Sequence, residues 1–76
     1  MNRLADLAFG AEARVSAVEG HDEIALRLLE MGLTPGAEVR LLGAAPLGDP
    51  LELLVRGYHL SVRRAEAARI EVTPLS

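Results

Sequence analysis

The chain contains no cysteine and no lysine, and its 76 residues include one Phe, one Tyr and no Trp. Without cysteine, disulfides and thiolate metal sites are excluded. With one Phe and one Tyr, the core must consist of Leu, Val, Ile and Ala, and the aromatic residues usual in a protein that binds single-stranded nucleic acid are not seen. The net charge is −3 and the acids and arginines are interspersed, so a basic face is absent. We therefore expect no nucleic-acid partner.

Long hydrophobic runs are missing as well. No stretch approaches the roughly 20 apolar residues that a membrane-spanning helix needs. The N-terminus lacks the apolar centre of a signal peptide, because Asp6 and Gly10 interrupt it. A length of 76 residues is typical of one domain with a modest core. We expect a single cytoplasmic domain over residues 1–76, without direct membrane insertion.

Residues 22–31 have the periodicity of an amphipathic helix. Ile24, Leu28 and Met31 fall within one apolar stripe. Asp22 is placed to accept hydrogen bonds from the free N–H groups of the first turn. The pattern predicts a helix that lies over an end or flank of the domain.

A helix stop and a tight turn follow. Gly32 ends the helix, since glycine adopts the left-handed conformation of a helix terminus at little cost. Leu33 is then placed to pack back onto Leu28, as in a Schellman motif. Pro35 and Gly36 are typical of the central positions of a type I or type II turn. The chain therefore leaves the helix at a set angle and enters a strand.

The rest of the chain is dominated by short alternating segments with turn residues between them. These predict strands rather than helices, and about five strands of this length indicate a small barrel. A short lead-in carries Leu4 and Leu7, and Gly57-Tyr58 is expected to form a hairpin connection. The expected strands cover 12–18, 37–42, 51–56, 59–64 and a last strand around 70–72, with a helical turn at 65–68. The expected fold class is mostly β, a small barrel with one inserted helix at 22–31.

Three segments in register resemble one protein family. They read R-L-L-E-M-G-L-T-P-G at 27–36, A-P-L-G-D-P at 45–50 and V-R-G-Y-H-L-S-V-R-R-A-E-A at 55–67. Together they are similar to the FeoA family, small bacterial proteins of ferrous iron transport. The resemblance implies an SH3-like barrel that acts as a cytoplasmic accessory protein of the FeoB transporter and docks on its GTP-binding part. It lies in scaffold residues that set turns, namely Gly32, Pro35, Gly36, Pro46, Pro50 and Gly57.

No set of residues indicates catalysis, since no Ser or Thr has a motif that would bring a base and an orienting group to it. His21 and His59 are interpreted as solvent-exposed side chains. The family is associated with transition metals, and Fe²⁺ is a possible ligand. Ferrous iron favours clustered His and carboxylate ligands, however, and this chain has two histidines and scattered acids. We expect neither a metal site nor a cofactor.

The remaining candidates are on the surface. Leu26 lies on the charged side of the helix, and Leu42 and Leu54 occupy outward phases of their strands. One interpretation is that Leu4 and Leu7 of the lead-in cover the two strand leucines in a second small cluster. The other is an apolar patch for a partner, because exposed apolar patches mark interaction sites. The candidate docking residues are Leu26, Arg27, Glu30, Leu42, Leu47 and Leu54.

The sequence is also consistent with two other functions. The chain could be a regulatory module resembling the C-terminal barrel of metal-dependent repressors, or a direct iron-binding protein, and weak homo-oligomers are possible. A role in GTP hydrolysis would require an arginine at the nucleotide, for which Arg27, Arg56, Arg63 and Arg64 are equally available.

Overall fold

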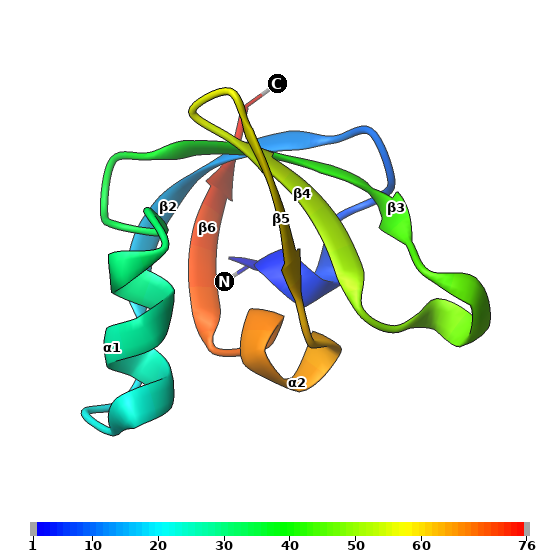
Figure 1. The fold of residues 1–76 in the computed structure, drawn as a ribbon. Helices are drawn as coiled ribbons and strands as arrows, with labels where there is room; N and C mark the ends of the chain where they lie inside the picture. The colour runs from blue at the N-terminus through cyan, green and yellow to red at the C-terminus, as the bar shows by residue number, and fades with distance from the viewer. Residues whose placement is uncertain (1, 76) are drawn as a thin grey trace.

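A computed structural model describes residues 2–75 of the chain, which form one curled antiparallel sheet with short helical segments at its margins (Figure 1). The strand order is β1-β6-β2-β3-β4-β5. The expected mostly-β fold is confirmed. In chain order the elements are β1 (Asn2–Arg3), η1 (Leu4–Asp6), β2 (Glu12–Val18), α1 (Glu23–Glu30), β3 (Glu38–Ala44), η2 (Pro46–Gly48), β4 (Leu51–Val55), β5 (Tyr58–Val62), α2 (Arg64–Ala67) and β6 (Ile70–Pro74).

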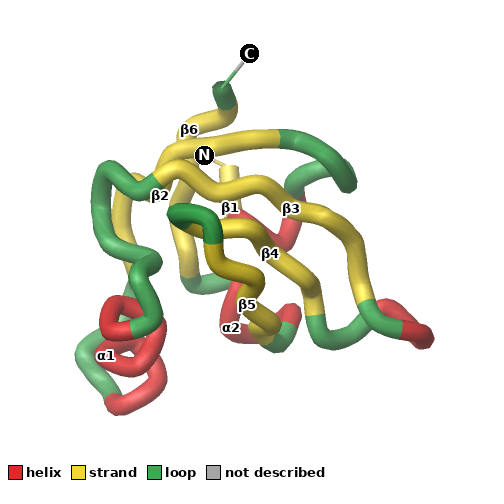
Figure 2. Tube along the Cα trace, turned by 45° about the horizontal axis from the view of Figure 1, so that its top comes forward, coloured by secondary structure: helices red, strands yellow, loops and turns green. Residues whose placement is uncertain are grey.

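The two edges of the sheet are β1 and β5, and the space between them is covered by helical segments. The sheet wraps around until α2 packs against η1 (Figures 1 and 2). Leu4 of η1 and Ala67 of α2 are fully buried there. This cover protects a small sheet from edge-to-edge pairing.

The core inside the barrel is aliphatic, as the shortage of aromatic residues predicts. No polar or charged side chain is buried in the part of the chain that the structure describes. The core residues alternate along the strands and are joined by Leu28 of α1 and by Leu33, which follows the helix. The fully buried large side chains are Leu4, Leu28, Leu33, Leu41, Leu51, Leu53, Ile70, Val15, Val39 and Val62.

The helix and its ends follow the sequence prediction closely. The Asp22 carboxylate accepts a hydrogen bond of 3.0 Å from the Ala25 N–H. At the C-terminal end, the Leu33 N–H donates to the Leu28 carbonyl (3.2 Å) and the Gly32 N–H donates to the Leu29 carbonyl (3.0 Å). This pair of bonds defines a Schellman motif, and Gly32 has the left-handed φ of 105° that it requires.

The turn after the helix is of type II. The Ala37 N–H donates to the Thr34 carbonyl at 3.0 Å, so Pro35 and Gly36 are the central residues. Gly36 has φ of 94°, which distinguishes type II from type I. The turn leads directly from α1 into β3.

The β4–β5 hairpin differs from the prediction by one residue. Val55 pairs with Tyr58, so the connection is Arg56-Gly57 and Tyr58 belongs to β5. Both central residues have positive φ, 52° and 82°, as a type I′ turn requires. The prediction of Gly57-Tyr58 was wrong because the chain forms a type I′ turn one residue earlier, and Arg56 takes its first left-handed position although it is not glycine.

The lead-in also differs from the prediction. Asn2 and Arg3 form a sixth strand against β6, Leu4 belongs to the main core, and the partly buried Leu7 packs against that core. The interpretation that they form a second cluster over Leu42 and Leu54 is therefore wrong. The lead-in instead closes the barrel.

Candidate docking surface

The candidate docking residues do not form one patch. Leu26, Arg27 and Glu30 lie on α1, whereas Leu47 is at the tip of the connection between β3 and β4. Figures 1 and 2 place α1 and this connection on opposite sides of the molecule. A single partner surface could contact both only by wrapping around the domain.

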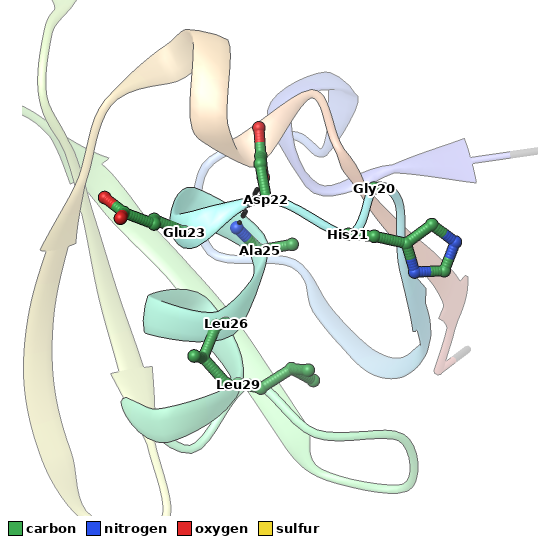
Figure 3. A pocket seen from close by; sticks show the side chains of 7 residues that line it. All are labelled: Gly20, His21, Asp22, Glu23, Ala25, Leu26 and Leu29. Atoms are coloured by element: carbon green, nitrogen blue, oxygen red, sulfur yellow. Dashed lines mark hydrogen bonds between the residues drawn. The ribbon is translucent and has the colours of Figure 1, made fainter.

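The first candidate surface is a hollow of about 340 Å³ beside the N-terminal half of α1. Figure 3 shows Leu26 and Leu29 on successive turns of the helix, with His21 and Glu23 nearer its start. Leu26 is 57% exposed. Leu26 was predictable as a candidate from its position on the charged side of the helix. The hollow was not predictable, because it depends on how the loop at Gly20 approaches α1.

Ion pairs tie α1 to the opposite end of the chain. Arg27 pairs with Glu66 of α2, and the Arg69 guanidinium lies 2.8 Å from the Asp22 carboxylate. Asp22 therefore accepts from both Arg69 and Ala25. The Arg69 hydrogen bond is the larger cause, and the Ala25 N–H the next, of a pKa of Asp22 below its ordinary value of 3.8. The N-cap Asp22 and Arg27 of α1 are thus both engaged within the domain.

The second candidate surface is the outer face of the sheet. Leu54 is opposite Arg40 on β3, and Arg40 in turn pairs with Glu12 on β2 at 2.9 Å. Leu54 is half-buried among these charged side chains. Leu42 is 38% exposed and lies where the β3–β4 register shifts, at a bulge that the sequence did not indicate. This face offers isolated leucines within a charged surface.

The third candidate surface is the turn Ala45–Gly48. The Gly48 N–H donates to the Ala45 carbonyl at 2.9 Å, so Pro46 and Leu47 are the central residues of this turn. Leu47 has φ of 76° and ψ of 4°, close to the values of the third position of a type II turn. Its side chain is fully exposed, with a relative accessibility of 106%. Leu47 is the most exposed of the candidate leucines.

The histidines and acids do not converge. His21 and His59 are both exposed. Between residues 2 and 75, no three His, Cys, Asp or Glu side chains lie close enough together to hold a metal ion. None of the helices in that range is long and apolar enough to cross a bilayer.

Comparison with known proteins identifies similar sequences over nearly the whole chain. The model of the FeoA domain family matches residues 2–74. A fusion protein of Fe(2+) transport protein A and the Fe(2+) transporter FeoB from Porphyromonas gingivalis is 39% identical over 74 residues. These residues are 97% of this chain but 9% of the relative, so the chain spans a small part of that protein.

Solved structures share the fold. The FeoA protein from Chlorobium tepidum has a TM-score of 0.91 at 39% identity, covering 99% of this chain and 71% of that one. A Stenotrophomonas maltophilia FeoA complexed with zinc has a TM-score of 0.83 at 34% identity, covering 95% and 89% of the two chains. That protein is described as an SH3 domain protein possibly acting as a ferrous iron transport activating factor.

The same fold also occurs within a longer chain. IdeR from T. acidophilum matches with a TM-score of 0.83 at 27% identity, covering 96% of this chain and 33% of that one. The similarity places the barrel within one third of a longer chain.

Proposed function

Because this chain belongs to the FeoA family of ferrous iron transport, we propose that it is a non-catalytic accessory protein that docks on the cytoplasmic, GTP-binding part of a FeoB-type transporter. The observation that carries this proposal is the Porphyromonas gingivalis relative, in which the similar 74 residues are joined to FeoB in one chain. Covalent linkage raises the effective concentration of two domains for one another, so fusion favours partners that act together.

The surface chemistry supports docking rather than catalysis. The exposed candidates are leucines on a scaffold whose polar side chains are directed to solvent. Polyproline ligands of SH3 domains need a groove lined by Tyr, Trp or Phe, and this chain has only Tyr58 and Phe9 of that kind. Contacts with the transporter would therefore be aliphatic and charged, and the candidate residues are those on α1, the outer sheet face and the turn at Leu47.

The test is a titration of isotope-labelled chain with the full-length transporter in lipid nanodiscs, loaded with GDP or a GTP analogue. Amide signals report contact through shifts or line broadening. Localised changes on one of the three candidate surfaces, absent with empty nanodiscs, are expected. No change in either nucleotide state would overturn direct docking.

The same labelled protein is titrated with Fe²⁺ under anaerobic conditions. We propose that the accessory role needs no resident metal, so Fe²⁺ alone should leave the amide signals unchanged. Shifts confined to residues next to His21 or His59, at stoichiometric metal, would instead support direct iron binding. This arm separates a docking protein from an iron carrier.

A second candidate is a regulatory barrel module, which the likeness to one third of IdeR favours. On that hypothesis the chain binds a metal-dependent regulator rather than the transporter. A pull-down from the same cells with the transporter deleted distinguishes the two. Retention of a repressor without the transporter would favour the regulatory module.

A further inference from the structure

Leu47 occupies a backbone position that favours glycine. In the left-handed conformation an L-residue holds its Cβ close to a carbonyl oxygen, and only glycine, or at times Asn or Asp, adopts it routinely. A bulky residue with positive φ is strained and persists only where its surroundings determine it. The fully exposed side chain of Leu47 packs on nothing that would compensate. The domain itself gains nothing from this leucine.

Hydrogen bonds on both sides nevertheless hold the turn in one conformation. The Ala45 N–H donates to the Pro50 carbonyl at 2.9 Å and closes the base of the loop. The Arg64 Nε–H donates to the Gly48 carbonyl at 2.8 Å, and the Arg64 backbone N–H donates to the Asp49 carboxylate at 3.0 Å. These two bonds fix the loop to the start of α2.

A leucine presented in this way is suited to binding. Its backbone is already ordered, so little conformational entropy is lost when a partner covers it. Its full apolar surface is removed from water on contact, which is the main source of affinity for such a side chain. The strain at Leu47 therefore has a use only if something outside the domain buries the side chain.

We infer that Leu47 is an anchor for an apolar socket on the cytoplasmic part of the FeoB-type transporter, and that Arg64 is the residue that positions it. The inference rests on the proposed function and names its contact point. The transporter is chosen as occupant because the Porphyromonas gingivalis relative carries both proteins in one chain. Arg64 acts through the loop, since its side chain holds Gly48 and not Leu47 itself.

The experiment measures the affinity of the chain for the full-length transporter in nanodiscs by biolayer interferometry. Leu47→Asn keeps the turn, because asparagine tolerates positive φ, and removes the apolar anchor. Its affinity is expected to fall roughly ten- to hundredfold, the range that burial of one leucine side chain supplies. Leu47→Met keeps an apolar side chain and is expected to retain binding within a few-fold.

Arg64→Ala is expected to weaken binding several-fold by releasing the Gly48 carbonyl. Arg63→Ala is the matched control, because Arg63 is the adjacent exposed arginine and no side-chain hydrogen bond joins it to the loop among residues 2–75. A double-mutant cycle tests the positioning role. Arg64→Ala should weaken binding when Leu47 is present and have little further effect in Leu47→Asn.

Different failures have different meanings. If the wild-type chain does not bind the transporter, the proposed function is overturned along with the anchor. If the wild type binds and Leu47→Asn binds equally well, only the anchor is overturned. If Arg64→Ala weakens both backgrounds equally, Arg64 contacts the partner directly and its positioning role is overturned.

Sedimentation of the chain alone tests whether the transporter or a second copy of this chain binds Leu47. Self-association that disappears in Leu47→Asn would place the side chain in a second copy, for instance in the hollow beside α1, and would overturn the transporter as occupant. Sedimentation that is the same for wild type and Leu47→Asn supports the transporter. Thermal unfolding of each variant checks that the fold is kept.

Discussion

Two turns of this molecule have the same type of backbone conformation and contrast at their third residue. Thr34–Ala37 and Ala45–Gly48 each place proline second and close with an N–H to carbonyl bond, of 3.0 and 2.9 Å. Their third residues have φ of 94° and 76°. The third residue is Gly36 in the first turn and Leu47 in the second.

The surroundings of the two turns explain the difference. The first turn is flanked by the buried Leu33 directly before it and ends on the buried Ala37, so it sets how α1 meets β3. The second turn carries its central leucine into solvent. A glycine in this position relieves strain for the fold, whereas a leucine keeps the strain and displays a side chain. The same turn conformation therefore connects buried elements at Thr34–Ala37 and exposes a leucine to solvent at Ala45–Gly48.

The largest expected effect is on stability, and it comes from comparing the buried Leu33 with the exposed Leu47. Leu33→Ala removes a fully buried side chain at the end of the Schellman motif, and the free energy of unfolding should fall by about 2–5 kcal/mol. Leu47→Ala should change it by less than about 0.5 kcal/mol, since the Leu47 side chain is fully exposed. Urea denaturation measures both. A loss above about 1 kcal/mol for Leu47→Ala would mean that Leu47 packs against the domain in solution.

The second prediction puts a leucine into the scaffold turn. Gly36→Leu should lower the free energy of unfolding by about 1–2 kcal/mol, the cost of a left-handed L-residue. A Cβ at Gly36 meets no atom within 4 Å, so the loss comes from backbone conformation rather than from a clash. Gly36→Asn is the control and should lose less. Equal stability of Gly36→Leu and wild type would show that the turn can change its type.

The third prediction removes the strain from the surface turn. Leu47→Asn should raise the free energy of unfolding by up to about 1 kcal/mol, because asparagine tolerates positive φ better than leucine. Leu47→Gly should gain less, since glycine also increases the entropy of the unfolded chain. Thermal unfolding compares the three proteins. A loss of stability in both variants would mean that the left-handed leucine is not strained.

The conformation of the turn Thr34–Ala37 was predictable from sequence, and that of the turn Ala45–Gly48 was not. Asp22, Gly32, Pro35 and Gly36 each have a local physical preference that matches the place they occupy, so α1, its stop and the following turn could be read directly. Leu47 contradicts its local preference. A leucine after a proline does not indicate a left-handed conformation, so the loop could be placed but its strained tip could not.

Pairings distant in sequence account for the other errors. Arg27 pairs with Glu66 of α2, 39 positions further along the chain. Arg69 reaches Asp22 across 47 positions of the chain. Such contacts depend on how β6 and α2 come to lie beside α1, which no local pattern records. The three separate candidate surfaces have the same cause, since the leucines could be identified singly but not located relative to one another.

The smallest expected effect concerns the two arginines whose hydrogen bonds hold α1 and the surface turn in place. Arg69 holds α1 through the Asp22 carboxylate, whereas Arg64 holds the surface turn through the Gly48 carbonyl, which does not titrate. Asp22→Asn keeps the helix cap, because Asn and Asp cap equally well, and loses the charge pair with Arg69. Wild type should therefore be modestly more stable than this variant at pH 7.

That advantage should disappear in acid. The pKa of Asp22 is lowered in the folded chain, first by Arg69 and then by the Ala25 N–H, so its contribution is full above the ordinary value of 3.8 and is lost as pH falls through the folded pKa. Urea denaturation at pH 7, 5 and 3 should show the gap between wild type and Asp22→Asn narrowing only in the last step. The stability difference between wild type and Arg64→Ala should not change over the same pH range, because the Gly48 carbonyl that Arg64 binds does not titrate. A stability difference between wild type and Asp22→Asn that stays constant with pH would mean that Arg69 holds α1 by packing. Neither Arg69 nor Arg64 would then act through a group that titrates.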